Sequence, residues 1–117
     1  IRGTMERATG STPIDVPLTG PSWDGNLWGL TFAALPLKQD GSYAVPFWQY
    51  DKGFGTFTAR VVGSEDVDTP SGKTAAWIVE AGADPARLTR YSIAKATRQE
   101  IGYSAGPNGQ RLGGVCR

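Results

Sequence analysis

Apolar and polar residues alternate along most of the chain from residue 41 onward. Successive side chains of a β-strand point to opposite faces, so a period of two predicts strands with one covered face. Alternating runs occur at residues 43–47, 56–61, 74–80, 90–93, 99–103 and, more weakly, 110–115. Turn-forming residues separate these runs at 51–53, 70–72, 82–85, 95–97 and 106–109. The pattern predicts an antiparallel meander of about five or six strands.

Two of these segments carry additional information. Asn108-Gly109 is the strongest hairpin signal in the chain, because both residues tolerate the positive φ of a tight turn. The strand around Trp77 is apolar on both of its faces. This predicts a central strand that is covered on both sides.

Residues 24–35 have a different spacing and predict the single helix. Pro36 ends this segment, and Asp24 is suited to be its N-cap. The expected apolar stripe follows a helical spacing and consists of Leu27, Leu30, Thr31, Ala34 and Leu35. We therefore expect an α+β fold that is mainly antiparallel β, a curved half-barrel meander with one helix packed on it.

The first 20 residues are less regular. Ile14, Val16 and Leu18 alternate with Pro13, Asp15, Pro17 and Thr19, which is typical of an extended edge segment. An earlier strand is expected at about residues 2–7. The length of 117 residues fits one domain, which we place over residues 1–117.

Charge and composition exclude several classes of function. The chain has 12 Lys and Arg against 11 Asp and Glu, so it lacks the basic excess of a nucleic-acid-binding protein. Histidine is absent, which excludes Ser-His-Asp and Cys-His catalysis. A single cysteine, Cys116, excludes an intrachain disulfide and a cysteine metal cluster. We expect no cofactor, no metal and no transmembrane segment.

Two short motifs resemble functional loops but lack their defining residues. Ser71-Gly72-Lys73-Thr74 resembles the end of a phosphate-binding loop, whose first glycine is replaced here by Val67. Asp66-Val67-Asp68 resembles the start of a calcium loop, which then continues with Pro70, Ser71 and Trp77 where an Asp or Asn, a Gly and a Glu are required. A hairpin turn and a solvated strand end explain these segments better. The 11 acidic residues contain no pair that stands out, so a carboxylate-dependent hydrolase is the least favoured function.

The four tryptophans leave two interpretations open. They are Trp23, Trp28, Trp48 and Trp77, and aromatic side chains of this kind most often fill small cores. They also line apolar cavities and interfaces. The residues we expect to line such a cavity are Leu27, Trp28, Leu30, Leu35, Phe57, Trp77, Ile93 and Ile101.

Three stretches together resemble a known group of proteins. They are WDGNLWGLTFAALPL, GTFTARVVGSEDVDTPSGKTAAWIVEAG and RYSIAKATRQEIGYSAGPNGQRL. The pattern resembles uncharacterised bacterial exported proteins that are similar to the lipoprotein localisation factors and mycobacterial lipoprotein relatives. The matching positions are Gly63, Glu65, Val67, Thr69, Pro70, Gly72, Lys73, Trp77, Val79, Glu80, Tyr91, Ile93, Lys95, Thr97 and Arg98.

The resemblance implies a strongly curved half-barrel with a helix in its concave face. It implies a periplasmic or otherwise exported binding protein without enzymatic activity, whose partner is a lipid, an acyl chain or another hydrophobic small molecule. Members of the group are usually longer, so we expect this chain to be the C-terminal part of a longer half-barrel. Its open sheet edge would favour a homodimer. The alternative is a structural or protein-interaction domain whose core is filled by its own side chains.

Overall fold

The computed structural model describes residues 1–23, 27–49 and 52–113. It contains one helix and two antiparallel sheets, which confirms the α+β, mainly antiparallel fold class. The elements are β1 (Arg2–Arg7), β2 (Gly10–Asp15), α1 (Trp28–Ala34), β3 (Ser42–Gln49), β4 (Gly53–Thr69), β5 (Gly72–Gly82), β6 (Thr89–Ala94), β7 (Glu100–Ala105) and β8 (Asn108–Arg111).

The main sheet is a meander of six strands in the order β3-β4-β5-β6-β7-β8, as the alternating pattern predicts. Tight turns connect two of its hairpins, with Thr69 paired to Gly72 and Ala105 paired to Asn108. The second turn is made by Gly106 and Pro107, and Gly106 supplies the positive φ of 58°. The predicted hairpin at residues 106–109 is therefore confirmed, but Asn108-Gly109 does not form its turn, because these two residues begin β8.

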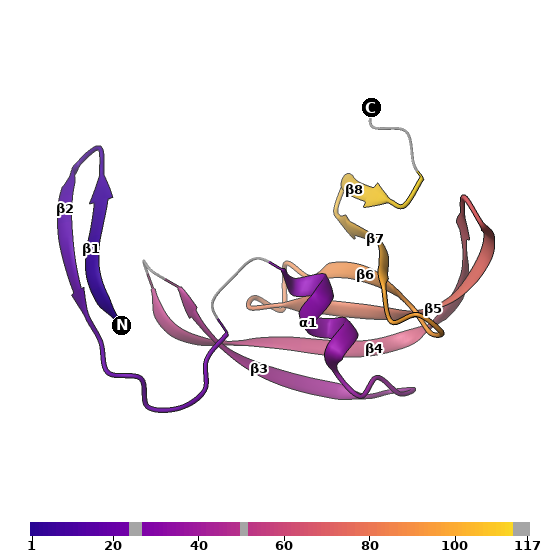
Figure 1. Cartoon of the computed structure of the whole chain (residues 1–117), viewed down its shortest axis with the longest axis horizontal. Coiled ribbons are helices and arrows are strands. Elements are labelled where there is room, and N and C mark those ends of the chain that lie inside the picture. The colour runs from indigo at the N-terminus through magenta and orange to yellow at the C-terminus, as the bar shows by residue number, and fades with distance from the viewer. Residues whose placement is uncertain (24–26, 50–51, 114–117) are drawn as a thin grey trace.

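The sheet is curved, and it is open at both edges in the part of the chain that the structure describes. Irregular pairing occurs in β4 between Val61 and Gly63, and in β6 between Ser92 and Ile93. Bulges of this kind increase the local twist and bend a sheet. Figure 1 shows α1 lying across one face of the curved sheet.

The helix is shorter than predicted and buries a different face. It begins at Trp28 with Leu27 as N-cap and no side-chain capping bond, while Asp24 lies outside the described residues. Its buried residues are Gly29, Phe32 and Ala33. Leu27 and Leu30 from the predicted stripe are 63% and 62% exposed.

The physical reason for this orientation is the aromatic spacing of Trp28 and Phe32. Residues four apart lie on the same helix face, so both rings point to the sheet together. The Trp28 ring stacks on Phe57 of β4 with 4.0 Å between ring centroids, and Phe32 meets Tyr91 of β6 at 4.9 Å. These rings bury more apolar surface than the leucine stripe would, which leaves the leucines facing outward.

Both flanks of the helix are fixed to the sheet. Before the helix, Trp23 donates its backbone N–H to Pro46 O at 2.8 Å and accepts the N–H of Trp48 at 3.0 Å. After the helix, the Tyr43 hydroxyl donates to Pro36 O at 2.6 Å, and the Arg98 guanidinium donates to Leu35 O at 2.8 Å. These bonds connect the segments before and after the helix to the rest of the fold.

The main core fills the space between α1 and the sheet. It contains Phe32, Ala33, Leu37, Ala59, Val61, Val79, Ala81 and Ile93. A second, smaller cluster of Ala76, Ala94 and Ile101 packs with Val67. Alternation along β5 and β6 places this second cluster on the sheet face away from the helix. As the apolar pattern around Trp77 predicts, β5 is buried on both faces, with Ile78 and Val79 at 1% and 0% exposure.

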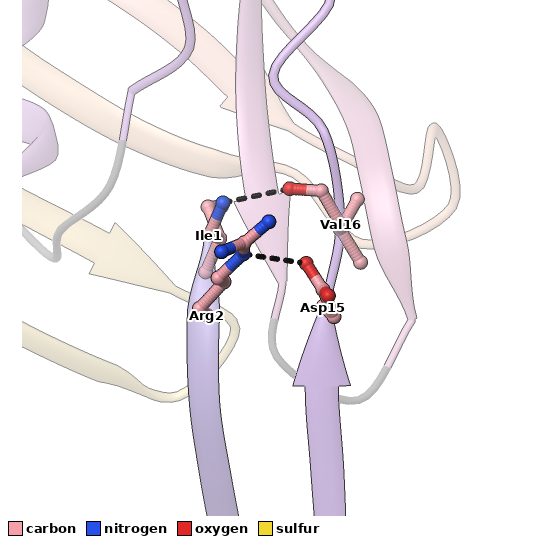
Figure 2. Close-up of polar contacts among 4 residues, drawn as sticks. All are labelled: Ile1, Arg2, Asp15 and Val16. Carbon is pink, nitrogen blue, oxygen red and sulfur yellow. Dashed lines mark hydrogen bonds and ion pairs between the residues drawn. The ribbon is translucent and has the colours of Figure 1, made fainter.

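The first two strands form a separate hairpin that stands to one side of the main sheet (Figure 1). Its strand at Arg2–Arg7 confirms the expectation of an early strand, and its partner ends at Asp15. At its open end the Ile1 ammonium donates to Val16 O at 2.6 Å, and Arg2 pairs with Asp15 at 3.0 Å (Figure 2). The Arg2 and Asp15 side chains are 85% and 72% exposed, so this ion pair contributes little stability.

The structure contains no helix, within the residues it describes, that has the length and apolar character needed to cross a membrane.

Candidate functional site

A cleft of about 370 Å³ lies between the first turn of α1 and the strands β6 and β7. The helix supplies one wall of the cleft, and the two strands supply the other. Its lining residues are Leu27, Trp28, Gly29, Leu30, Thr89, Tyr91, Glu100 and Tyr103. The segment that follows α1 is hydrogen-bonded to Tyr43 of β3 and to Arg98, which positions the helix wall of the cleft.

The pairing of β6 with β7 brings the polar lining residues together. Tyr91 is paired with Tyr103, and their ring centroids are 6.1 Å apart. The irregular pairing at Ser92 and Ile93 places Glu100 opposite Ile93. Residues that are paired across two strands share a sheet face, so the two tyrosines and Glu100 all lie on the face covered by α1.

Glu100 reaches the backbone of the helix because position 29 is a glycine. A β-carbon at Gly29 would overlap the carboxylate group of Glu100. Burial against α1 raises the pKa of the Glu100 carboxyl above its usual value of 4.5. Among the lining residues, Glu100 is the one that carries a formal charge.

Tyr91 is the second polar group whose ionisation depends on the cleft. Burial is the largest cause that raises the pKa of its phenol above 10.0, and the nearby Glu100 carboxylate raises it further. A hydrogen bond with the Thr89 side chain acts in the opposite direction. Tyr91 therefore keeps its proton at neutral pH and is available as a hydrogen-bond donor.

The predicted cavity residues are divided between this cleft and the core. Leu27, Trp28 and Leu30 line the cleft. Leu35, Phe57 and Trp77 instead pack against the main core, to which the fully buried Ile93 belongs. Ile101 lies in the second cluster on the other face of the sheet.

The concave face itself is occupied by the protein's own aromatic side chains. Phe32 is completely buried, and Trp28 and Phe57 stack beside it. The Lys95 ammonium lies over the Trp77 ring, 3.9 Å from the ring centroid. The eight residues expected to line one cavity therefore do not enclose one space, and the open volume lies at the edge of the helix instead.

Five cleft residues were not predicted from the sequence, namely Gly29, Thr89, Tyr91, Glu100 and Tyr103. The available signal was the pair of tyrosines in consecutive predicted strands, each at an alternating position. A tyrosine often presents an apolar ring to a core and a hydroxyl to a polar neighbour. Glu100 gave no signal, because its position depends on the irregular pairing of β6 with β7.

The two motifs that resemble functional loops have structural roles. Ser71-Gly72-Lys73-Thr74 forms part of the β4–β5 hairpin, with Gly72 at a φ of 107°, and a strand follows it. Asp66-Val67-Asp68 lies within β4, where Val67 packs against the second apolar cluster. Within the described ranges, no three acidic or cysteine side chains are grouped as metal ligands would be.

The comparisons with known proteins place the chain in one family. No curated protein and no solved structure matches it. A sequence model of the family described as "Protein of unknown function (DUF3108)" matches residues 1–103, which include α1, the first six strands and most of β7. The match includes every residue that lines the cleft. The chain therefore belongs to the DUF3108 family.

Proposed function

We propose that this protein is a non-enzymatic binding domain that holds a small ligand with an apolar chain in the cleft between α1 and β6–β7. The observation that carries this proposal is the position of Leu27 and Leu30. Both leucines line the cleft and remain more than 60% exposed. Exposed apolar side chains that border a concave site are typical of ligand-binding surfaces.

The size and lining of the cleft support a small ligand. Its volume of about 370 Å³ lies near the lower end of the roughly 300–1,000 Å³ of ligand sites. Two leucines and Trp28 provide apolar area, while Tyr91 and Glu100 provide convergent polar groups. Covering a leucine side chain completely contributes about 1.5–3 kcal/mol, so two partly covered leucines supply a useful share of the binding energy.

The resemblance to lipoprotein carriers supports an apolar ligand and a place of action in the bacterial envelope. The resemblance implies a curved sheet and a helix that would enclose an acyl chain between them. Here the concave face is filled by Phe32 and its neighbours, so we place the ligand at the edge of the helix. An acyl chain or another single alkyl chain fits this proposal best.

The composition of the cleft supports binding rather than catalysis. Carboxylate-dependent glycoside hydrolysis requires two acidic groups on opposite sides of the bond, and the cleft contains Glu100 alone. The pKa of the Tyr91 phenol is raised, which is the wrong direction for a base at neutral pH. The chain has no histidine to supply this function.

Titration of the isotope-labelled protein with 1-octanol, followed by NMR, tests the proposal. We expect chemical shift changes at the amides of Leu27, Leu30, Tyr91 and Glu100. Leu30→Ser should weaken octanol binding, whereas the matched control Leu18→Ser should not. Leu18 is similarly exposed, at 58%, but it does not line the cleft. Shift changes elsewhere, or equal effects of the two substitutions, would contradict this location.

A structural or protein-interaction domain is the second candidate, because the concave face is filled by Phe32, Trp28 and Phe57. Gentle purification followed by native mass spectrometry and lipid extraction separates the two functions. A co-purified lipid or fatty acid supports the binding protein. A clean mass of the chain alone, together with no octanol response, favours the interaction domain.

A further inference from the structure

The cleft has a negative charge and no positive one among its lining residues. The cations near the helix and on β6 have other partners in the structure. Arg98 donates to Leu35 O, Arg90 pairs with Glu65, and Lys95 lies over the Trp77 ring. The Glu100 carboxylate is therefore a half-buried anion that faces a cleft open to a ligand.

Aromatic residues line the same cleft as this anion. Tyr91 and Tyr103 line the cleft side by side on β6 and β7, with 6.1 Å between ring centroids, and Trp28 lines it from the helix. The face of an aromatic ring carries partial negative charge and attracts a cation placed within about 6 Å of its centroid. A carboxylate together with several aromatic rings is the combination of groups that recognises an organic ammonium ion.

From this arrangement we infer that the cleft binds an organic ammonium group. The cation lies against the Glu100 carboxylate and the rings of Tyr91 and Tyr103, and the attached alkyl chain follows Leu27 and Leu30. This inference rests on the proposed function, and it adds the charge and the chemical class of the ligand. Gly29 has a specific part in it, because its missing side chain leaves the carboxylate room beside the helix.

A carboxylic acid is the competing ligand, because a protonated Glu100 can hydrogen-bond to it. Burial raises the pKa of Glu100, and the titratable groups that face it are Tyr91 on β6 and Tyr103 on β7. The described residues of α1 include no titratable side chain. Ammonium binding should therefore weaken as acid protonates Glu100, whereas binding of a carboxylic acid should strengthen.

Calorimetric titration with three probes of one chain length tests the inference. The probes are octyltrimethylammonium, octanoate and 1-octanol, each below its micellar concentration and at neutral pH. We expect octyltrimethylammonium to bind at least about tenfold more tightly than the other two, a difference of about 1.4 kcal/mol. Acidification through the pKa of Glu100 should remove this preference.

Substitution of Glu100 identifies the group responsible. Glu100→Gln should lower the affinity for octyltrimethylammonium to that of 1-octanol. The matched control is Glu80→Gln, which removes the same charge from β5 on the sheet face away from the helix. The control should keep the preference for the ammonium probe.

The outcomes separate this inference from the proposed function. Equal binding of the three probes, tighter binding of octanoate, or an unchanged ammonium affinity in Glu100→Gln overturns the ammonium site. In those cases, 1-octanol binding that depends on Leu30 still supports the apolar cleft. If no probe binds, both the ammonium site and the proposed function are wrong.

Discussion

The carboxylate of Glu100 lies against Gly29 of α1, in the space that a β-carbon at position 29 would occupy. The two residues come from opposite walls of the cleft and are far apart in the sequence. Their contact requires the irregular pairing that turns Glu100 toward the helix, and it requires the absence of a side chain on the helix. The position of Glu100, the one charged group among the lining residues, therefore depends on the irregular strand pairing and on the glycine at position 29.

Gly29→Ala should separate binding from stability. Alanine is favoured over glycine inside a helix by about 1 kcal/mol, and the carboxylate that it displaces is at the end of a flexible side chain. We expect a free energy of unfolding within about 1 kcal/mol of the original protein and a lower affinity for octyltrimethylammonium.

Urea unfolding and calorimetric titration measure these two effects. Gly63→Ala is the control, because no atom lies within 4 Å of the β-carbon it would add. The control should leave the affinity unchanged. A Gly29→Ala variant that binds the probe as tightly as the original protein would contradict the proposed role of this contact.

Phe32→Ala should be strongly destabilising. Phe32 is fully buried, and its ring contacts Trp28, Phe57 and Tyr91. Removing a buried phenylalanine side chain costs about 3–5 kcal/mol, a large part of the roughly 5–15 kcal/mol that stabilises a domain. Leu30→Ala on the same helix should change the free energy of unfolding by less than about 0.5 kcal/mol, because Leu30 is exposed. Similar losses in the two variants, measured by urea unfolding, would show that α1 packs through a different face.

Glu100 should make stability depend on pH. Burial raises its pKa in the folded state above the usual 4.5, so the folded protein holds this proton more tightly than the unfolded chain does. The stability gained from the proton is fully present below 4.5 and is lost as the pH rises through the raised folded value. In Glu100→Gln the side chain stays uncharged at every pH, so this loss of stability does not occur.

We therefore expect Glu100→Gln to become more stable relative to the original protein as the pH rises from below 4.5 to neutrality. The gain should stay below about 1 kcal/mol, because the side chain keeps contact with water that screens its charge. Urea unfolding of both proteins across this range measures the difference. A difference that shrinks with rising pH would mean that Glu100 has a stabilising cation partner.

Hydrogen exchange should distinguish the β1–β2 hairpin from the main sheet. The hairpin forms a sheet of its own and stands apart in Figure 1, and a two-stranded hairpin alone is marginally stable in water. Amides of β1 and β2 should exchange much faster than those of β5, whose residues Ile78 and Val79 are buried on both faces of the sheet. Equal protection would show that the hairpin docks on the main sheet or on a second copy of the chain.

The order of strands in the fold could be predicted because each strand alternates and each turn has turn-forming residues. The central place of β5 followed from apolar residues on both of its faces, and the hairpin at residues 70–72 from its proline and glycine. These signals are local, so a single sequence contains them. The helix was also predicted, but the prediction of its buried face was wrong. That prediction followed the spacing of the leucines and not the spacing of the Trp28 and Phe32 rings.

The cleft could not be predicted because it depends on how β6 pairs with β7. A symmetric hairpin around Lys95-Ala96-Thr97 pairs Tyr91 with Ile101. In the structure the connection is longer, Arg98 has a φ of 60°, and Tyr91 pairs with Tyr103. A small shift in register moves side chains to the other face of a sheet, so Ile101 leaves the helix-covered face and Glu100 enters it.

Each ladder of the six-stranded sheet joins strands that follow one another along the chain, from β3–β4 to β7–β8. Such neighbouring contacts close short loops, and domains rich in them fold faster than domains that pair distant segments. The helix differs, because α1 precedes all six of these strands and contacts β6 and β7. We therefore expect the hairpins to form in succession. The packing of α1 against the sheet is complete only after β7 has formed. The cleft would then be the last region to assemble, and a ligand that binds it would recognise only the finished molecule.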